Sequence, residues 1–275
     1  MISAALTVQA LTVHVRGIGL VGPGLADWAS GRALLAHPAA WQATPAVLVA
    51  PSRLPPAERR RAGEIVKLSL AVADQACSGA GIDPRTLATV FSASTGDASN
   101  CHVLCEALAS PERVVSPTRF TNSVHNAPAG YWHIATSSQA PSTSLCAFDA
   151  SFGAGLLEAV AQCCAGQRPV LLVTGDVPYP EPLRGARPIS DSLGLALLLA
   201  HAPGDHDLPS LALRLGQAPA SSCGHAGLDR LRVAVPAGCA LPLLQALARR
   251  EAKTVTLDYL DGLSLMIDVI PTASP

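Results

Sequence analysis

Two side chains that could act as nucleophiles lie close together in residues 140–166, APSTSLCAFDASFGAGLLEAVAQCCAG: the thiol of Cys146 and the carboxylate of Asp149. The stretch begins with a run typical of a buried strand, residues 142–147, and continues as a small-residue helix, residues 153–167. A strand that turns sharply into a helix presents the turn residue to a pocket, beside free backbone N–H groups and the positive helix end. Hydrolases and acyltransferases place their nucleophiles on such turns, so the pattern is suited to acyl chemistry.

Both candidates also have an interpretation without chemistry. An aspartate at a helix N-terminus is an ordinary capping residue, and a carboxylate attacking a thioester would form a strained, readily reversed mixed anhydride. Cys146 precedes the turn, so we expect it inside the strand, buried and unreactive. We therefore expect Asp149 to cap the helix and Cys146 to be inert.

The same stretch resembles the β-ketoacyl synthases, members of the thiolase-like fold, whose pattern is Gly-Pro-Ser, a short strand, then Thr-Ala-Cys-Ala/Ser-Ser-Gly opening a helix. Pro141 and Ser142 match the first part, and Ser151 matches the serine after the nucleophile. Counted without gaps from Pro141, the nucleophilic cysteine falls on Asp149. The resemblance therefore implies that the active-site cysteine is missing and that this chain has no catalytic residue.

A second segment, residues 116–130, can be laid on the ketosynthases without a gap, with Asn126 and Gly130 on the family's Asn and Ala-Gly. In the family this segment reaches across the dimer and shapes the partner's acyl tunnel. The resemblance implies that a set of its residues forms the tunnel or the interface: Arg119, Phe120, Thr121, Asn122, His125 and Asn126. Of these, we expect Arg119, Phe120 and His125 at the closed end of the tunnel.

Condensing enzymes of this kind also need two histidines from a second half of the chain, one in a Gly-Thr-Gly-rich loop and one in a Gly-His-x-x-Gly motif. Residues 222–227, SCGHAG, are faintly similar to the second motif, and the first is missing, so we interpret the match as coincidence. His125 and His133 have no identifiable catalytic partner and are expected to be structural.

Three groups of cysteine and histidine are close in sequence: Cys101–His102–Cys105, Cys163–Cys164 and Cys223–His225. None has the paired Cys-x-x-Cys spacing of a structural zinc site, and cysteine also packs as a small hydrophobic residue. We expect no metal and no other cofactor. Eight cysteines in 275 residues do not make a disulfide framework, so a reducing cytoplasm is the expected location.

The composition combines 49% hydrophobic with 14% charged residues, which predicts extensive burial, partly against another subunit. A net charge of −1 gives no reason to expect nucleic acid or an anionic membrane as partner. Residues 1–15 have no basic start and no long apolar core, so neither a signal peptide nor a membrane span is expected. The run Arg59–Arg60–Arg61 is interpreted as a solvated helix start, with a carrier-protein contact as the alternative.

Apolar periodicity and turn residues predict the elements that position these side chains. Strands are expected at residues 11–20, 46–50, 87–94, 142–147, 169–175, 193–201, 210–216, 231–235 and 255–260, and helices at 25–37, 54–78, 100–109, 153–167 and 241–250. The alternation predicts an α/β fold with a mainly parallel sheet covered by helices on both faces. The resemblance, over residues 11–202, implies a thiolase-like half fold with a five-stranded type of sheet, in one domain of residues 1–275. Residues 208–275 form an unmatched strand-helix-strand extension.

A ketosynthase-like first half without nucleophile or catalytic second half resembles the chain-length-factor-like proteins of aryl polyene and related type II polyketide or fatty acid pathways. The resemblance implies a non-catalytic subunit that pairs with an active ketosynthase as a heterodimer and meets acyl carrier protein through that complex. Two alternatives stay open. One is a stand-alone acyltransferase or hydrolase using Cys146 or Asp149, and the other is a homodimer that binds acyl chains without condensing them.

Overall fold

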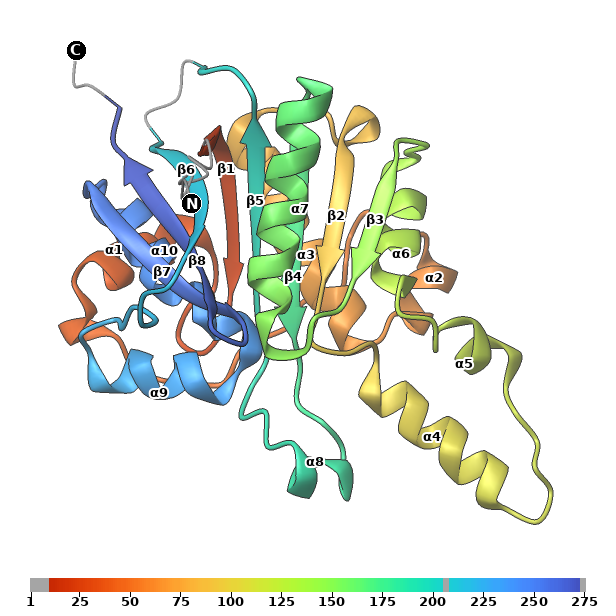
Figure 1. Cartoon of the computed structure of the whole chain (residues 1–275). Coiled ribbons are helices and arrows are strands. Elements are labelled where there is room, and N and C mark those ends of the chain that lie inside the picture. The colour runs from red at the N-terminus through yellow and green to blue at the C-terminus, as the bar shows by residue number, and fades with distance from the viewer. Residues whose placement is uncertain (1–9, 205–207, 273–275) are drawn as a thin grey trace, which may run out of the picture.

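The computed structural model of the protein describes residues 10–204 and 208–272, and its strands form one eight-stranded sheet with the order β3-β2-β4-β5-β1-β6-β8-β7 (Figure 1). The strands are β1 (Leu11–Val21), β2 (Ala88–Ser92), β3 (Ser142–Leu145), β4 (Val170–Asp176), β5 (Leu193–Ala200), β6 (Ser210–Gly216), β7 (Lys253–Leu260) and β8 (Leu263–Ile270). Residues 1–9, within the stretch considered for a signal peptide, and residues 273–275, at the end of the predicted extension, lie outside the described residues. Within the described ranges, no helix has the length and apolarity needed to cross a membrane.

The sheet is mixed. β2 pairs in parallel with β3 and β4, whereas the other described pairs are antiparallel. The α/β class is confirmed, but the expected mainly parallel sheet of five strands is wrong. The reason is that β5, with the sequence LGLALLLA, is buried along its whole length. A strand covered on both faces reads as a continuous apolar run whichever direction its neighbours take.

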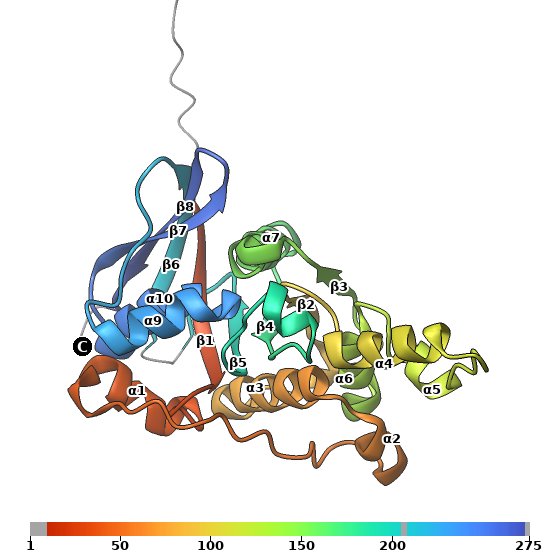
Figure 2. The ribbon, with the colours of Figure 1, turned by 90° about the horizontal axis from the view of Figure 1, so that it is seen from below.

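Helices cover both faces of the sheet, as expected. They are α1 (Trp28–Ala36), α2 (Pro56–Arg61), α3 (Glu64–Ala80), α4 (Ala98–Ala109), α5 (Pro117–Thr121), α6 (Ala127–Thr136), α7 (Ser151–Gly166), α8 (Leu183–Ala186), α9 (Ala226–Ala234) and α10 (Leu241–Arg249). Figure 2 shows α7 on one face of the central strands and α3 with α6 on the other. Each face has its own buried hydrophobic cluster, one centred on α7, α10 and β6 to β8, the other on α3 and α6.

The contact between β1 and α3 depends on two glycines. A Cβ at Gly17 would overlap the carbonyl oxygen of Ala76, and one at Gly19 would overlap that of Val72. Since both overlaps are with helix backbone, no side-chain rearrangement could relieve them. Gly17 and Gly19, which end the predicted strand in the sequence pattern, therefore lie inside β1 and let α3 pack directly on it.

Two elements in the first third of the chain differ from the sequence prediction. Residues 46–50 form no strand; they are an extended loop in which Val47 and Val49 are exposed. The single helix expected over residues 54–78 is two helices, because the chain becomes extended at Ala62 and Gly63. A Cβ at Gly63 would overlap the carboxylate of Asp97. α3 runs two residues past the predicted end at residue 78, and Gly81 closes it in the left-handed conformation.

The C-terminal part also departs from prediction. Residues 231–235, expected as a strand, belong mostly to α9, in which Leu228 and Leu231 are buried at helical spacing. Strand β8 was not expected, and it forms an antiparallel hairpin with β7 through a turn at Asp261 and Gly262, which has a φ of 69°. An Asp-Gly pair between apolar runs is a strong hairpin signal. β6, β8 and β7 all extend the central sheet.

Candidate functional site

The turn between β3 and α7 is sharp because one residue takes a left-handed backbone conformation. That residue is Phe148, with a φ of 52°, the first residue of the 3₁₀ turn Phe148–Ala150. Ser151 closes the turn: its buried hydroxyl accepts from the backbone N–H of Ala147 at 2.9 Å and lies 2.7 Å from the carbonyl oxygen of Phe148. The serine identified by resemblance thus shapes the turn.

In a strand-turn-helix site the nucleophile occupies the strained position of the turn. Here that position belongs to Phe148, which has no nucleophilic atom, and Asp149 follows it. The expected capping role of Asp149 is wrong, because no helix N–H is bonded to its carboxylate at the start of the turn or of α7. Its side chain is 63% exposed and forms an ion pair with Arg187, with Nη2 and Oδ1 2.5 Å apart.

Cys146 is exposed, contrary to expectation, because β3 is the edge strand and the residue follows its end. Its sulfur lies 2.9 Å from the carbonyl oxygen of Ala93, to which the thiol donates. Although the residue as a whole is exposed, partial burial of its sulfur near Ala93 removes water from it and raises the pKa of this thiol above its ordinary value. A raised pKa keeps the group as a thiol at neutral pH, and the thiolate is the nucleophilic form.

A buried carboxylate, Asp176, joins the loops beneath this turn. Its two oxygens accept from the backbone N–H groups of Ser94 and Ala237, each at 2.8 Å. Burial raises the pKa of Asp176, while these hydrogen bonds act in the opposite direction. Asp176 therefore fixes the ends of β2 and β4 relative to the C-terminal part. Neither Asp176 nor Arg187 was predicted from the sequence. The pair Gly175–Asp176 at the end of an apolar run was the one signal for Asp176, and Arg187 had none.

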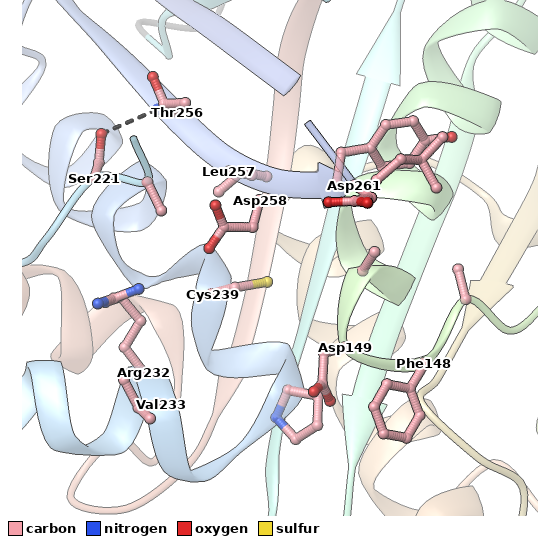
Figure 3. A pocket seen from close by; sticks show the side chains of 16 residues that line it. Phe148, Asp149, Ser221, Arg232, Val233, Cys239, Thr256, Leu257, Asp258 and Asp261 are labelled. Carbon is pink, nitrogen blue, oxygen red and sulfur yellow. Dashed lines mark hydrogen bonds between the residues drawn. The ribbon is translucent and has the colours of Figure 1, made fainter. Parts of the chain in front are cut away.

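A cavity of about 450 Å³ opens beside the turn (Figure 3). It lies between Phe148–Ala150, α9, residues 236–239 and the β7–β8 turn, and three carboxylates line it: Asp149, Asp258 and Asp261. Arg232 also lines it but is paired with Asp229. No histidine is among the described residues that line this cavity. One thiol, that of Cys239, lines the cavity, and burial raises its pKa to about 12, so it stays protonated at neutral pH.

The histidines and cysteines singled out in the sequence lie elsewhere. His225 caps α9, since its Nδ1 accepts from the backbone N–H of Leu228, and its ring meets Trp41 edge to face. Among the described residues, no group of three or more His, Cys, Asp or Glu side chains is arranged to hold a metal ion. In the basic run, Arg59 donates to the carbonyl oxygens of Ser52 and Leu54, which makes it part of the local structure.

The predicted interface segment has structural and exposed members. Asn122 donates to the carbonyl oxygen of Arg61 and accepts from the hydroxyl of Tyr131, so it ties α2 to α6. Thr121 donates to the carbonyl oxygen of Pro117 within α5. Phe120 is 69% exposed, and Arg119 beside it is exposed as well. In Figure 1, α4 and α5 extend away from the body of the molecule as an arm.

His125 and Asn126 lie near the free edge of the sheet. Together with Ser142 and Ser144 of β3, they line a second open cavity of about 450 Å³. β3 is the last strand in the order, so one of its sides is unpaired within the described chain. The carbonyl oxygens of Pro141 and Leu145 accept from the backbone N–H groups of Thr89 in β2 and of Ala93 just after it. Because backbone groups alternate along a strand, the N–H groups of Ser142 and Ser144 point to the free edge.

Comparison with known proteins places these features in a family. The beta-ketoacyl synthase, N-terminal domain family matches residues 28–256, which extends past the region of recognisable resemblance. Comparison with curated protein sequences gave no match.

Solved structures give the fold. A chain of the ketosynthase ApeO in complex with its chain length factor ApeC from Xenorhabdus doucetiae is 24% identical, with a TM-score of 0.71 over 94% of this chain and 99% of that one. The ishigamide ketosynthase/chain length factor is 15% identical, with a TM-score of 0.69 over 95% and 100%. The AntDE:AntF complex, an acyl-carrier protein with its ketosynthase, is 12% identical, with a TM-score of 0.71 over 96% and 100%. The expected thiolase-like fold is thereby confirmed, and the chain belongs to the β-ketoacyl synthase family through its N-terminal domain.

Proposed function

We propose that the protein is a chain-length-factor-like, non-catalytic subunit that pairs with an active β-ketoacyl synthase and shapes its acyl tunnel during polyene, polyketide or fatty acid chain elongation. The observation that carries the proposal is the turn itself. In a ketosynthase-family fold, the strained position holds Phe148, and the next residue, Asp149, is engaged with Arg187. Ketosynthase/chain length factor pairs among the similar structures support the same conclusion.

The free edge of β3 supports pairing with a ketosynthase. Exposed apolar side chains lie on the elements near this edge, namely Phe120, Val124 and Ile134. Large exposed apolar side chains beside an unpaired strand favour association, because the strand can add another strand and the apolar groups can be buried. We infer a heterodimer in which this edge and the segment Arg119–Asn126 contact the ketosynthase, which brings the acyl carrier protein.

The exposed arm suggests how the subunit would set product length. Phe120, Arg119 and His125 would form the closed end of the partner's tunnel, and a growing chain stops when its tip meets that wall. A pocket discriminates by roughly 1–3 kcal/mol per methylene, enough to move a product distribution by one extension cycle. We also propose that residues 1–275 form a single domain, and that the chain works in the cytoplasm, where its eight unpaired cysteines would stay reduced.

The test is reconstitution with the ketosynthase that co-purifies with this chain. The pair should condense acyl thioesters, the chain alone should not, and Asp149→Asn should reduce product formation by far less than the hundredfold expected of a catalytic group. Replacing the ketosynthase's own cysteine should abolish activity. Phe120→Ala should lengthen the products, with Leu108→Ala as the control, because Leu108 is an exposed apolar residue of α4 outside the proposed contact segment. Condensation by the isolated chain, or loss of activity in the folded Asp149→Asn complex, would contradict the proposal.

The free edge of β3 also keeps one alternative in view, since a second copy of this chain could pair there. Mass measurement of the chain alone and after mixing with the ketosynthase separates the two. A homodimer that persists in the mixture and never exchanges subunits would favour a self-sufficient acyl-binding protein.

A further inference from the structure

One side chain connects the loop after β4 to both residues of the turn before α7. Arg187 forms the ion pair with Asp149, and its guanidinium carbon lies 3.9 Å from the centre of the Phe148 ring. Such stacking of a guanidinium on an aromatic face is attractive in itself. Arg187 is 20% exposed, less than the carboxylate it meets, so the pair is partly shielded from water.

The loop that carries Arg187, residues 177–192, is attached near its C-terminal end, where Ser190 N–H donates to the carbonyl oxygen of Ala234 and the carboxylate of Asp191 accepts from Ala46 N–H, but its middle, residues 180–187, has few other attachments. It includes α8 and lies below the start of α7 in Figure 1. Val177 and Ile189 are buried, but no residue between them is. The backbone hydrogen bonds of residues 180–187 stay within the loop, from Arg184 to Pro180 and from Arg187 to Leu183. The position of this stretch therefore depends largely on one side chain.

The charge of Arg187 also acts on the end of the sheet. It lowers the pKa of Cys146 and of Asp176, although burial has the larger, opposite effect on both groups. The guanidinium is thus close to the place where β3 and β4 end. In this position the loop holds Arg187 against Phe148 and Asp149 in the turn before α7, although both of these side chains stay more than half exposed.

We propose that residues 177–192 form a strap, a loop that Arg187 holds across the start of α7. Asp149 is the ion-pair partner that keeps Arg187, and with it the strap, in place. The proposal goes beyond the subunit function and does not depend on it, because every contact lies within this chain. It assigns Asp149 a role that neither catalysis nor helix capping provides. Arg187 and Asp149 are positioning residues, and the strap has a fastened and a released state.

Hydrogen exchange of the full-length protein, followed by mass spectrometry of peptides from residues 177–192, tests the strap. Asp149→Asn keeps the shape and removes the charge, and Arg187→Gln removes the guanidinium. Each should speed exchange in the strap by about threefold to tenfold, the scale of a partly exposed ion pair together with a cation–π contact. The matched control is Asp258→Asn, because Asp258 lines the same cavity without an ion-pair partner among the described residues. The control should leave exchange unchanged.

A second measurement needs no variant. Raising the salt concentration from about 50 mM to about 500 mM shortens the screening length several-fold, so exchange in the strap of the natural protein should rise, and that of Arg187→Gln should not. The double variant Asp149→Arg/Arg187→Asp should return exchange toward the natural rate. The strap is refuted if exchange in residues 177–192 is unaffected by salt and by both single variants, or if Asp258→Asn speeds it as much as Asp149→Asn.

Discussion

Replacing Ser144 by proline would separate folding from partner binding. The N–H of Ser144 points to the free edge of β3, while the ladder with β2 uses the backbone of its neighbours Thr143 and Leu145. Proline removes only the outward N–H, which an edge strand tolerates, and the preceding residue is already extended, as proline requires. The variant should therefore fold, with its thermal midpoint within a few degrees of that of the natural protein.

Binding of Ser144→Pro to the ketosynthase should weaken, because the variant loses an interstrand hydrogen bond and its ring takes up space at the edge. One interstrand hydrogen bond contributes about 0.5–1.5 kcal/mol, and the proline ring occupies the space that the partner strand needs. A total of about 1–3 kcal/mol corresponds to a dissociation constant roughly 5- to 150-fold higher. Sedimentation of the variant with the ketosynthase measures this, and Ser144→Ala, which loses only the hydroxyl, should bind like the natural chain. If Ser144→Pro folds and binds with unchanged affinity, β3 is not the pairing edge.

Three further predictions concern the packing of β1 on α3, the ionisation of Asp176 and the reactivity of Cys146. Gly19→Ala should lower the free energy of unfolding by about 1–3 kcal/mol or more, because its Cβ overlaps the carbonyl oxygen of Val72. Gly79→Ala, where a Cβ meets nothing, should raise the free energy of unfolding by about 0.5–1 kcal/mol. Thermal unfolding should therefore show a lower midpoint for the first variant and a higher one for the second. Burial raises the pKa of Asp176 above 3.8, so the folded state holds its proton more tightly and the stability this group contributes falls as pH rises above that value. In urea titrations the unfolding free energy of Asp176→Asn minus that of the natural protein should grow as the pH rises above 3.8, and a pH-independent difference would contradict the assignment. Cys146 should react with iodoacetamide at pH 7 more slowly than a free cysteine, because its pKa is raised; faster reaction would revive the acyltransferase alternative.

Much of the fold could be predicted because the burial of a helix or strand shows in the local pattern of apolar residues. Residues 210–216 read as a strand and are β6, and the small-residue run after Ala150 is α7. Strand direction leaves no such trace: β5 is apolar throughout, although both of its neighbours are antiparallel. Residues 231–235 alternate only briefly, and the cap at His225 and the burial of Leu228 decide for a helix.

The residue types show that no cysteine stands at positions 148 and 149 of the turn, but they do not show how the side chains around the turn are arranged. A left-handed Phe148 has no sequence signal, because bulky residues rarely take positive φ. Asp149 and Arg187 are separated in the chain by α7 and β4, and nothing in the sequence of the loop that carries Arg187 indicates that this loop returns to the turn. From the sequence, Asp149 was interpreted as a helix cap because it stands next to a helix. In the structure its partner is Arg187, which comes from another loop.

The two ends of the sheet differ, and the difference limits how many chains can join. At the β7 end, the loop before α9 covers the middle of the strand: Ser221 N–H donates to the carbonyl oxygen of Thr256 at 2.9 Å, and its hydroxyl accepts from Thr256 N–H at 3.0 Å. At the β3 end no described strand does the same. Under the proposed heterodimer, a partner strand can add at β3, whereas Ser221 already occupies the backbone groups of Thr256 in the middle of β7. The loop before α9, far from the proposed contact, would thus favour a pair over a longer assembly.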